Sequence, residues 1–218
     1  MEKFRISLLA VIFGSVFYVL GKTILPPTAA SVTPSVFPTT VPLPTWQLQK
    51  SHPLAAPTPT AEFPEYISGR QYKYIQNGLP LDIEMRYMVN TPGHIKYYVR
   101  AILPSPNQLT FALRQHQGVG FYYVFAHQQR AYLSTCINSR GGTTVTETQF
   151  QRNRYLYDIQ LGRLLPWLLG QQSFQDKRCL WAHLSIPLKN SASGDSYQTL
   201  EKAWFDWYQW WHPRFPQY

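Results

Sequence analysis

Residues 81–89 read LDIEMRYMV, and this run decides the fold class. Every second residue from Leu81 to Val89 is apolar, and the residues between them are Asp82, Glu84, Arg86 and Met88. Successive side chains of a β-strand point to opposite faces, so a period of two predicts a strand that is buried on one side. Asn77-Gly78 before the run and residues 90–93 after it are typical of turns.

The same signal recurs on both sides of this strand. Further β-rich runs, separated by polar or glycine-containing breaks, lie at 70–76, 94–103, 109–113, 120–126, 131–137, 143–148 and 180–188. Strands that follow one another through short breaks usually pair with their chain neighbours. The sequence therefore predicts an antiparallel, meander-like sheet.

Two segments have the spacing of helices instead. Between Phe150 and Gly170, leucines recur at 161, 164, 165, 168 and 169. In residues 195–211 the apolar residues at 200, 203, 204, 207, 208 and 211 fall on one helix face, with Ser196 as a candidate N-cap and Pro213 as a stop. The predicted fold is α+β, an antiparallel sheet covered by helices on one face.

Phe205 and Trp210 lie off the apolar stripe of the last helix. The tryptophan stripe itself suits packing on the sheet, while the two remaining aromatic side chains would suit a membrane interface. Both interpretations stay open from the sequence, and neither makes this helix catalytic.

Ten of the 18 prolines fall between residues 26 and 64, among Thr, Ser and Ala. Proline lacks an amide donor and fixes φ, so this composition is typical of a semi-extended, flexible linker. The sequence divides into an N-terminal segment (1–22), a disordered linker (23–61) and a folded domain (62–218).

The N-terminal segment has a short basic start and an apolar run from Ile6 to Leu20. This pattern fits a cleaved secretory signal or an uncleaved signal anchor. The small residues at 28–30 lie beyond the run and make a poor cleavage site, which favours an anchor in the form of a transmembrane helix. Lys3 and Arg5 before the run predict a cytoplasmic N-terminus and an extracytoplasmic, periplasmic-side domain in the cell membrane.

The chain has 20 Lys and Arg against 11 Asp and Glu, a net charge of +9. No nucleic-acid recognition motif accompanies this charge, and the predicted topology places the domain outside the cytoplasm, so nucleic acid is not expected as a partner. Anionic headgroups, an acidic envelope polymer or an acidic protein suit the charge better. No metal-ligand spacing and no cofactor motif is present, so neither a metal nor a cofactor is expected.

Cys136 and Cys179 are the two cysteines. Outside the cytoplasm they would more often pair than stay free, although two free, buried thiols remain possible from the sequence. An enzyme hypothesis makes Cys136 a nucleophile, with His127 or His183 as its base and Arg140 beside a glycine pair as an anion clamp. Oxidation of the thiol argues against it, and no catalytic residue is assigned.

Three charged residues flank the cysteines: Arg140, Asp176 and Arg178. They form either a recognition surface around the bridge or an ordinary ion pair beside a turn. The glycine pair at 141–142 belongs to no phosphate-loop motif and predicts a tight turn.

Four strings carry a resemblance to a known family: YLSTCINSRG (132–141), LPWLLG (165–170), DKRCLW (176–181) and WYQWW (207–211). Together with the single N-terminal anchor, the chain resembles the cyanoexosortase A system-associated proteins of cyanobacteria. The resemblance implies a non-catalytic accessory protein that works with an integral-membrane exosortase, a cysteine transpeptidase that processes proteins with a C-terminal PEP-type sorting signal. It assigns no task to Cys136 or Cys179.

Three functions follow as hypotheses. The first is the exosortase accessory protein, with the exosortase or its sorted substrates as partners. The second is an envelope module that binds a polysaccharide or a peptide. The third is a hydrolase or transpeptidase that depends on Cys136.

Overall fold

The computed structural model describes residues 2–24, 36–55, 65–103, 109–160, 162, 167, 174–188 and 193–216. The chain divides into two compact units, residues 34–158 with 176–218, and residues 1–33 with 159–175. The first of these, called the folded unit below, contains the sheet.

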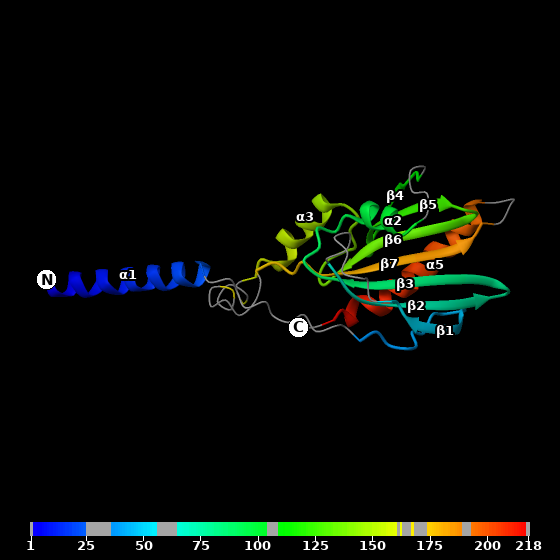
Figure 1. Cartoon of the computed structure of the whole chain (residues 1–218). Coiled ribbons are helices and arrows are strands. Elements are labelled where there is room, and N and C mark those ends of the chain that lie inside the picture. Colours follow the sequence, from blue (N-terminus) through cyan, green and yellow to red (C-terminus); the bar gives the residue numbers. More distant parts are fainter. Residues whose placement is uncertain are drawn as a thin grey trace. The chain divides into compact units, whose positions relative to one another are not determined.

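Within the described residues, seven strands form one antiparallel sheet in the order β1-β2-β3-β7-β6-β5-β4 (Figure 1). The strands are β1 (Gln47–Pro53), β2 (Tyr66–Gln76), β3 (Leu79–Met88), β4 (Ala112–His116), β5 (Gly120–His127), β6 (Arg130–Asn138) and β7 (Cys179–Pro187). Each half of the sheet is a three-stranded meander, which agrees with the predicted meander-like pairing except that β1 lies in the predicted linker. The last strand, β7, then inserts between the two halves and joins them.

Two helices cover opposite faces of this sheet, so the predicted α+β class is confirmed but the one-sided cover is wrong. On one face α5 (Ser193–Trp211) buries Trp204 and Trp207 against the strands. On the other face α2 (Ile95–Ile102) packs Tyr98 against Trp181, with ring centroids 5.4 Å apart. The central strand β7 is buried at both parities, so both of its faces are covered.

Two runs predicted as strands form no strand of the sheet. Residues 94–103 form α2, because the apolar residues at 95, 98, 99 and 102 also match one helix face. Residues 143 and 144 make isolated bridges only, and α3 (Glu147–Asp158) then begins. The five leucines predicted to form a helix lie outside the described residues.

The predicted linker is wrong for residues 36–55, which belong to the folded unit. The strand β1 pairs with β2, and Phe37, Val41 and Leu43 are buried in the core under α5. The hydroxyl of Tyr74 donates a hydrogen bond to the carbonyl of Val41 at 2.7 Å. Residues 45–52 contain no proline, and β1 is an edge strand, where proline is tolerated at the strand end. Residues 25–35 and 56–64 lie outside the described part.

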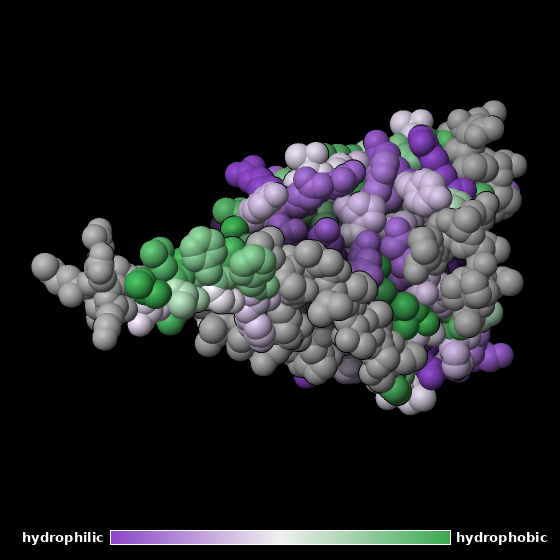
Figure 2. Space-filling view, turned by 60° about the vertical axis from the view of Figure 1, so that its left-hand side comes forward, coloured by the Kyte–Doolittle hydropathy of each residue, from purple (hydrophilic) through white to green (hydrophobic). Residues whose placement is uncertain are grey.

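The N-terminal unit contains α1 (Glu2–Ile24). Its large hydrophobic side chains are exposed: Ile6, Leu9, Val11, Ile12, Phe13, Val16, Phe17 and Tyr18. Green, hydrophobic residues of this helix are visible in Figure 2. Within the described residues, no helix has both the length and the mean hydropathy that crossing a membrane requires.

Candidate functional site

A disulfide joins Cys136 of β6 to Cys179 of β7, with the Cα atoms 5.6 Å apart. Both residues are fully buried on the α2 face of the sheet. The disulfide hypothesis is therefore confirmed. A bonded sulfur offers no thiolate, so Cys136 cannot attack a substrate in this state and the Cys136-nucleophile hypothesis is wrong for it.

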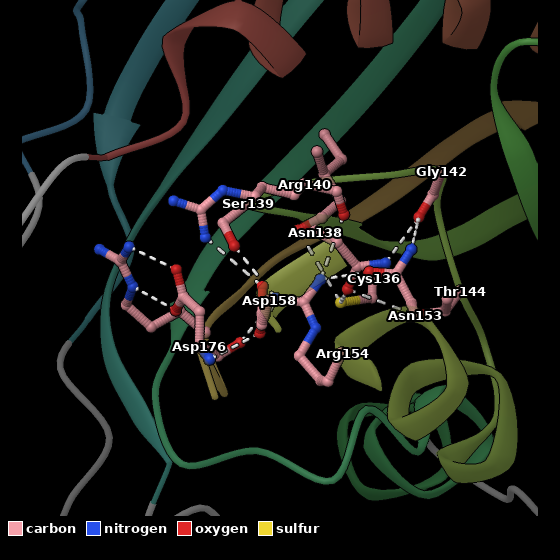
Figure 3. A network of polar contacts seen from close by, with 12 residues as sticks. Cys136, Asn138, Ser139, Arg140, Gly142, Thr144, Asn153, Arg154, Asp158 and Asp176 are labelled. Carbon is pink, nitrogen blue, oxygen red and sulfur yellow. Dashed lines mark hydrogen bonds and ion pairs between the residues drawn. The ribbon is translucent and has the colours of Figure 1, made fainter. Parts of the chain in front are cut away.

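Beside the disulfide, the side chains of Arg154 and Asp158 occupy the centre of a buried polar network (Figure 3). The guanidinium of Arg154 lies 3.4 Å from the Asp158 carboxylate and donates hydrogen bonds to the backbone carbonyls of Asp176 (2.7 Å) and Arg140 (3.1 Å). It also donates to the Ser139 hydroxyl at 3.0 Å. A charge without water needs such partners, so Arg154 holds the 139–140 turn against α3 and the start of β7.

Asp176 and Arg178 form a bidentate pair, with the two N···O distances at 2.6 and 2.7 Å. Burial alone would raise the pKa of the Asp176 carboxyl, but the hydrogen bonds and the charge of Arg178 outweigh it and lower the pKa. Arg178 also donates to the carbonyl of Pro216 at 2.8 Å. This pair therefore attaches the end of the chain to the start of β7.

The predicted recognition surface of Arg140, Asp176 and Arg178 is corrected by these contacts. Asp176 is 2% exposed and Arg178 is 7% exposed, so neither can meet a partner. Arg140 lies 3.4 Å from Asp158 and keeps 41% of its side chain in solvent. The three residues belong to a structural network, the ion-pair alternative that the sequence left open.

The turn at 139–142 depends on glycine. Gly141 has φ +72°, a conformation that residues with a Cβ rarely adopt, and a Cβ there would collide with Asn153 and Tyr157 of α3. The predicted tight turn is present. In it the side-chain amide of Asn138 donates a hydrogen bond to the Gly142 carbonyl at 2.6 Å.

The two aromatic residues predicted to face a membrane are half-buried on α5. The ring of Phe205 lies 4.1 Å from that of His116, and the ring of Trp210 lies 5.0 Å from that of Trp211. Both pack against the core under α5, so their partial burial needs no membrane. A membrane role for these two side chains stays a prediction.

A more open site lies on the α2 face, where polar side chains of β2, β3 and β7 point away from α5. A cavity of about 310 Å³ here is called the polar compartment, and its lining includes Lys73, Asp82, Glu84, Arg86, Tyr132, His183 and Ser185. Its lining carries two cations, Lys73 and Arg86, against two carboxylates, Asp82 and Glu84. Arg86 lies 2.6 Å from Glu84, and Arg130, outside the lining, lies 2.5 Å from Asp82. The compartment is therefore polar but close to electrically neutral.

A second cavity of about 310 Å³, called the apolar compartment, shares Arg86 and Ile102 with the first. Its other lining residues are Leu54, Ala55, Tyr66, Met88 and Trp181. We call the two compartments together the groove. Each compartment has the size of a small ligand pocket, and Arg86 and Ile102 line both.

Arg86 stands where the two compartments meet. Its guanidinium lies over the Trp181 ring, 4.7 Å from the centroid, and its Nη2 contacts Glu84. Its buried Nη1 has no hydrogen-bond partner among the described residues.

His183 of β7 supplies a second such atom. Burial, with a smaller effect from the charge of Arg86, lowers the pKa of this imidazole from 6.5 to about 3, so the ring is neutral at physiological pH. Its buried Nδ1 has no partner within the part of the chain that the structure describes. A neutral imidazole can donate at one nitrogen and accept at the other.

The groove was not predicted as a site, although the sequence shows some of its polar residues on one side of a strand. The alternation at 81–89 places Asp82, Glu84 and Arg86 on the polar side of a strand, which is normally a solvated face. Only the position of β7 beside β3 shows that Trp181 and His183 share this face. Among the described residues, no cluster of His, Cys, Asp and Glu is placed to hold a metal ion.

No protein-family model, curated protein or solved structure matches the chain. The function is therefore argued from the geometry of the groove and from the sequence.

Proposed function

We propose that the chain is a membrane-anchored, non-catalytic accessory protein of an exosortase-type protein-sorting system, which binds a protein partner through the groove. The observation that carries the binding role is the groove itself. It offers a neutral polar compartment and an apolar compartment side by side, with two buried polar atoms that lack partners among the described residues.

Two features support a position at the membrane with the folded unit on the extracytoplasmic side. The exposed apolar side chains of α1 are poorly placed in water and gain free energy when lipid covers them, which suits an anchor. The disulfide is typical of an oxidising compartment. The exosortase as partner rests on the family resemblance of the four strings.

A polysaccharide is a weaker candidate for the groove than a polypeptide. Sugar rings stack on open aromatic faces, but Trp181 is fully buried beneath the Arg86 guanidinium. Tyr132 is only 8% exposed, and its ring stacks on those of Phe125 and His183. The aromatic side chains near the groove therefore have little surface for a sugar.

The test is affinity purification of the full-length chain after cross-linking in its native membrane. The proposal expects the exosortase or one of its sorted substrates among the captured proteins. A control bait with the folded unit intact but with Arg86→Lys and Gln71→Ala should capture less of them. Capture of neither protein by the unaltered chain would contradict the proposal.

A further inference from the structure

We propose that the exposed side of α3 contacts a lipid surface with anionic headgroups, through an apolar pair, Tyr155 and Leu156, with the cations of Arg140, Arg152 and Lys177 around it. These five residues are called the α3 patch below. The inference rests on the proposed function, because it gives the folded unit of a membrane-attached chain a membrane contact of its own.

The last two turns of α3 place polar side chains inwards and apolar side chains outwards. Asn153, Arg154 and Asp158 are buried, whereas Tyr155 is 60% exposed and Leu156 is 64% exposed. A surface helix of a protein in water normally has the reverse arrangement, with its apolar stripe against the core. The apolar pair is therefore a surface that the sheet does not cover.

The buried network fixes this orientation of α3 (Figure 3). Arg154 donates to the backbone carbonyls of Arg140 and Asp176, and Asp158 accepts from the backbone N–H of Asp176. A rotation of α3 that buried Leu156 would break these bonds and leave charged groups without partners, which is costly. The outward position of the apolar pair is thus built into the fold.

Three cations lie around the end of α3. Arg152 is exposed and lies one turn before the apolar pair on the same side of the helix. Arg140 lies 3.4 Å from Asp158, the last residue of α3, and keeps 41% of its side chain in solvent. Lys177 is exposed directly before the start of β7, in the segment that the buried network holds against α3.

The carboxylates in this region do not cancel that charge at the surface. Asp158 is 0% exposed and Asp176 is 2% exposed, and arginines lie within ion-pair distance of both. Glu147, the other acidic residue of α3, lies about two turns before the apolar pair and accepts a hydrogen bond from Gln151. A partner that approaches the apolar pair therefore meets positive charge.

A lipid surface fits this combination better than other polyanions or an apolar protein surface. Tyrosine and leucine enter the boundary between headgroups and acyl chains, while cations beside them meet the lipid phosphates. A dissolved polyanion would pair with the cations and leave the apolar pair in water. An apolar protein surface would cover the pair and leave the cations without opposite charge.

The course of the chain agrees with this occupant. The helix α3 ends at Asp158, the last residue of its part of the folded unit. Residues 159–175, which follow it, belong to the compact unit that also contains α1, the proposed anchor. The α3 patch therefore lies where the chain leaves the folded unit for the unit that carries the anchor.

Quenching of a fluorescent label by spin-labelled lipid tests the contact. The full-length chain carries bimane at Leu156→Cys or, as a control, at Leu113→Cys on β4, a position that is 51% exposed. The native cysteines are joined in the disulfide, so the label reacts with the introduced thiol. Each chain is transferred from detergent into an excess of nanodiscs that contain doxyl lipid, with phosphatidylcholine alone or mixed with phosphatidylglycerol.

The expected result is quenching at position 156 but not at position 113 in discs with phosphatidylglycerol. Quenching at 156 should fall in phosphatidylcholine alone and at high salt, because the attraction to anionic headgroups is then absent or screened. Tyr155→Ser, made in the chain labelled at 156, should lower the ratio of contacting to free folded units by about tenfold, because less apolar surface enters the lipid.

Charge substitutions separate the α3 patch from the general basic character of the chain. Arg152→Gln should lower the same ratio by about fivefold, the loss expected for one cation at an anionic surface. The control Lys202→Gln removes an exposed cation of α5 and should leave the ratio unchanged.

Three results would overturn the inference. The first is equal quenching at positions 156 and 113, and the second is quenching at 156 that does not change when phosphatidylglycerol is left out. The third is a blue shift of the label at 156 that occurs without quenching and needs two copies in one disc, because it would assign the α3 patch to a second copy of the chain.

Co-elution of the chain with the discs, measured on the same samples, reports attachment through α1 separately. Co-elution without quenching at 156 removes this inference and leaves the proposed function. A chain that fails to co-elute contradicts the proposed anchor, and because discs are in excess, quenching at 156 still decides the inference in that sample.

Discussion

At the scale of single residues, Asp158 is the carboxylate that most of the buried network shares. It lies within 3.4 Å of both Arg140 and Arg154 and accepts a hydrogen bond from the backbone N–H of Asp176 at 2.8 Å. The variant Asp158→Asn keeps the shape but leaves the Arg154 charge uncompensated in the interior. We expect it to lower the free energy of unfolding by about 3–5 kcal/mol in urea titrations.

Asp195→Asn is the matched control, because Asp195 is exposed in the first turn of α5. It should change the free energy of unfolding by less than about 1 kcal/mol. Equal effects of the two substitutions would contradict the structural role given to the network.

His183 makes stability depend on pH. Its pKa is about 3 in the folded chain against 6.5 for the free side chain, so between these values the unfolded chain binds a proton that the folded chain does not. The contribution of His183 to stability is therefore complete above pH 6.5 and is lost as the pH falls towards 3, by a total on the order of 5 kcal/mol. Urea unfolding measured at a series of pH values follows it.

The variant His183→Gln should flatten the stability profile between pH 6.5 and 3, whereas His116→Gln, on the exposed strand β4, should not. An unchanged slope in His183→Gln would show that the imidazole is protonated in the folded chain already near its ordinary pKa.

At the scale of elements, the disulfide connects β7, the strand that joins the halves of the sheet, to β6 of one half. It links β6 to β7 across 43 residues of sequence, and such a loop restricts the unfolded chain. The double variant Cys136→Ala/Cys179→Ala should therefore lower the free energy of unfolding by about 2–4 kcal/mol. Urea titrations of the double variant and of the disulfide-bonded chain provide the comparison, and identical midpoints would contradict it.

The element α1 carries the proposed attachment to the membrane. Arginines in place of Val11 and Val16 should shift the full-length chain from the membrane pellet to the alkaline extract, because each guanidinium costs about 2.5–3.5 kcal/mol at the centre of a membrane helix. The control pair Val36→Arg/Leu113→Arg alters exposed positions of the folded unit and should leave the chain in the pellet. Equal extraction of the α1 variant and the control variant would contradict attachment to the membrane through α1.

The elements that the sequence predicts well are those with an unambiguous local period. The alternation at 81–89 and the tryptophan spacing at 200–211 match β3 and α5 closely. The strand prediction for 94–103 is wrong because Tyr and Val favour strands, although the spacing of the apolar residues also fits a helix. The contact between Tyr98 and Trp181 stabilises the helix α2 instead. The strand β1 is not predicted because the proline content was taken over the whole stretch 26–64, although residues 45–52 within it contain no proline.

At the scale of the whole molecule, the groove could not be predicted because it depends on strand order. The sequence shows the polar side of β3, and it shows Trp181 and His183 only as parts of a separate run. The insertion of β7 between β3 and β6 brings them together, and pairing between remote segments leaves no local pattern. In the buried network, Arg140, Asp176 and Arg178 are indicated by their position beside the cysteines, although their burial is not. The central residues Arg154 and Asp158 were not predicted, because their run shows no sign of the contacts they make.

The central claim is that a partner of the sorting system occupies the groove, and site-specific photo-cross-linking in the native membrane tests it most directly. A benzophenone amino acid is placed at Gln71, which lines the polar compartment, and in a second variant at Gln115, which is exposed on β4. The account predicts a cross-link to the exosortase or a sorted substrate from position 71 and none from position 115. A cross-link from position 115 alone, or none from position 71, would contradict it.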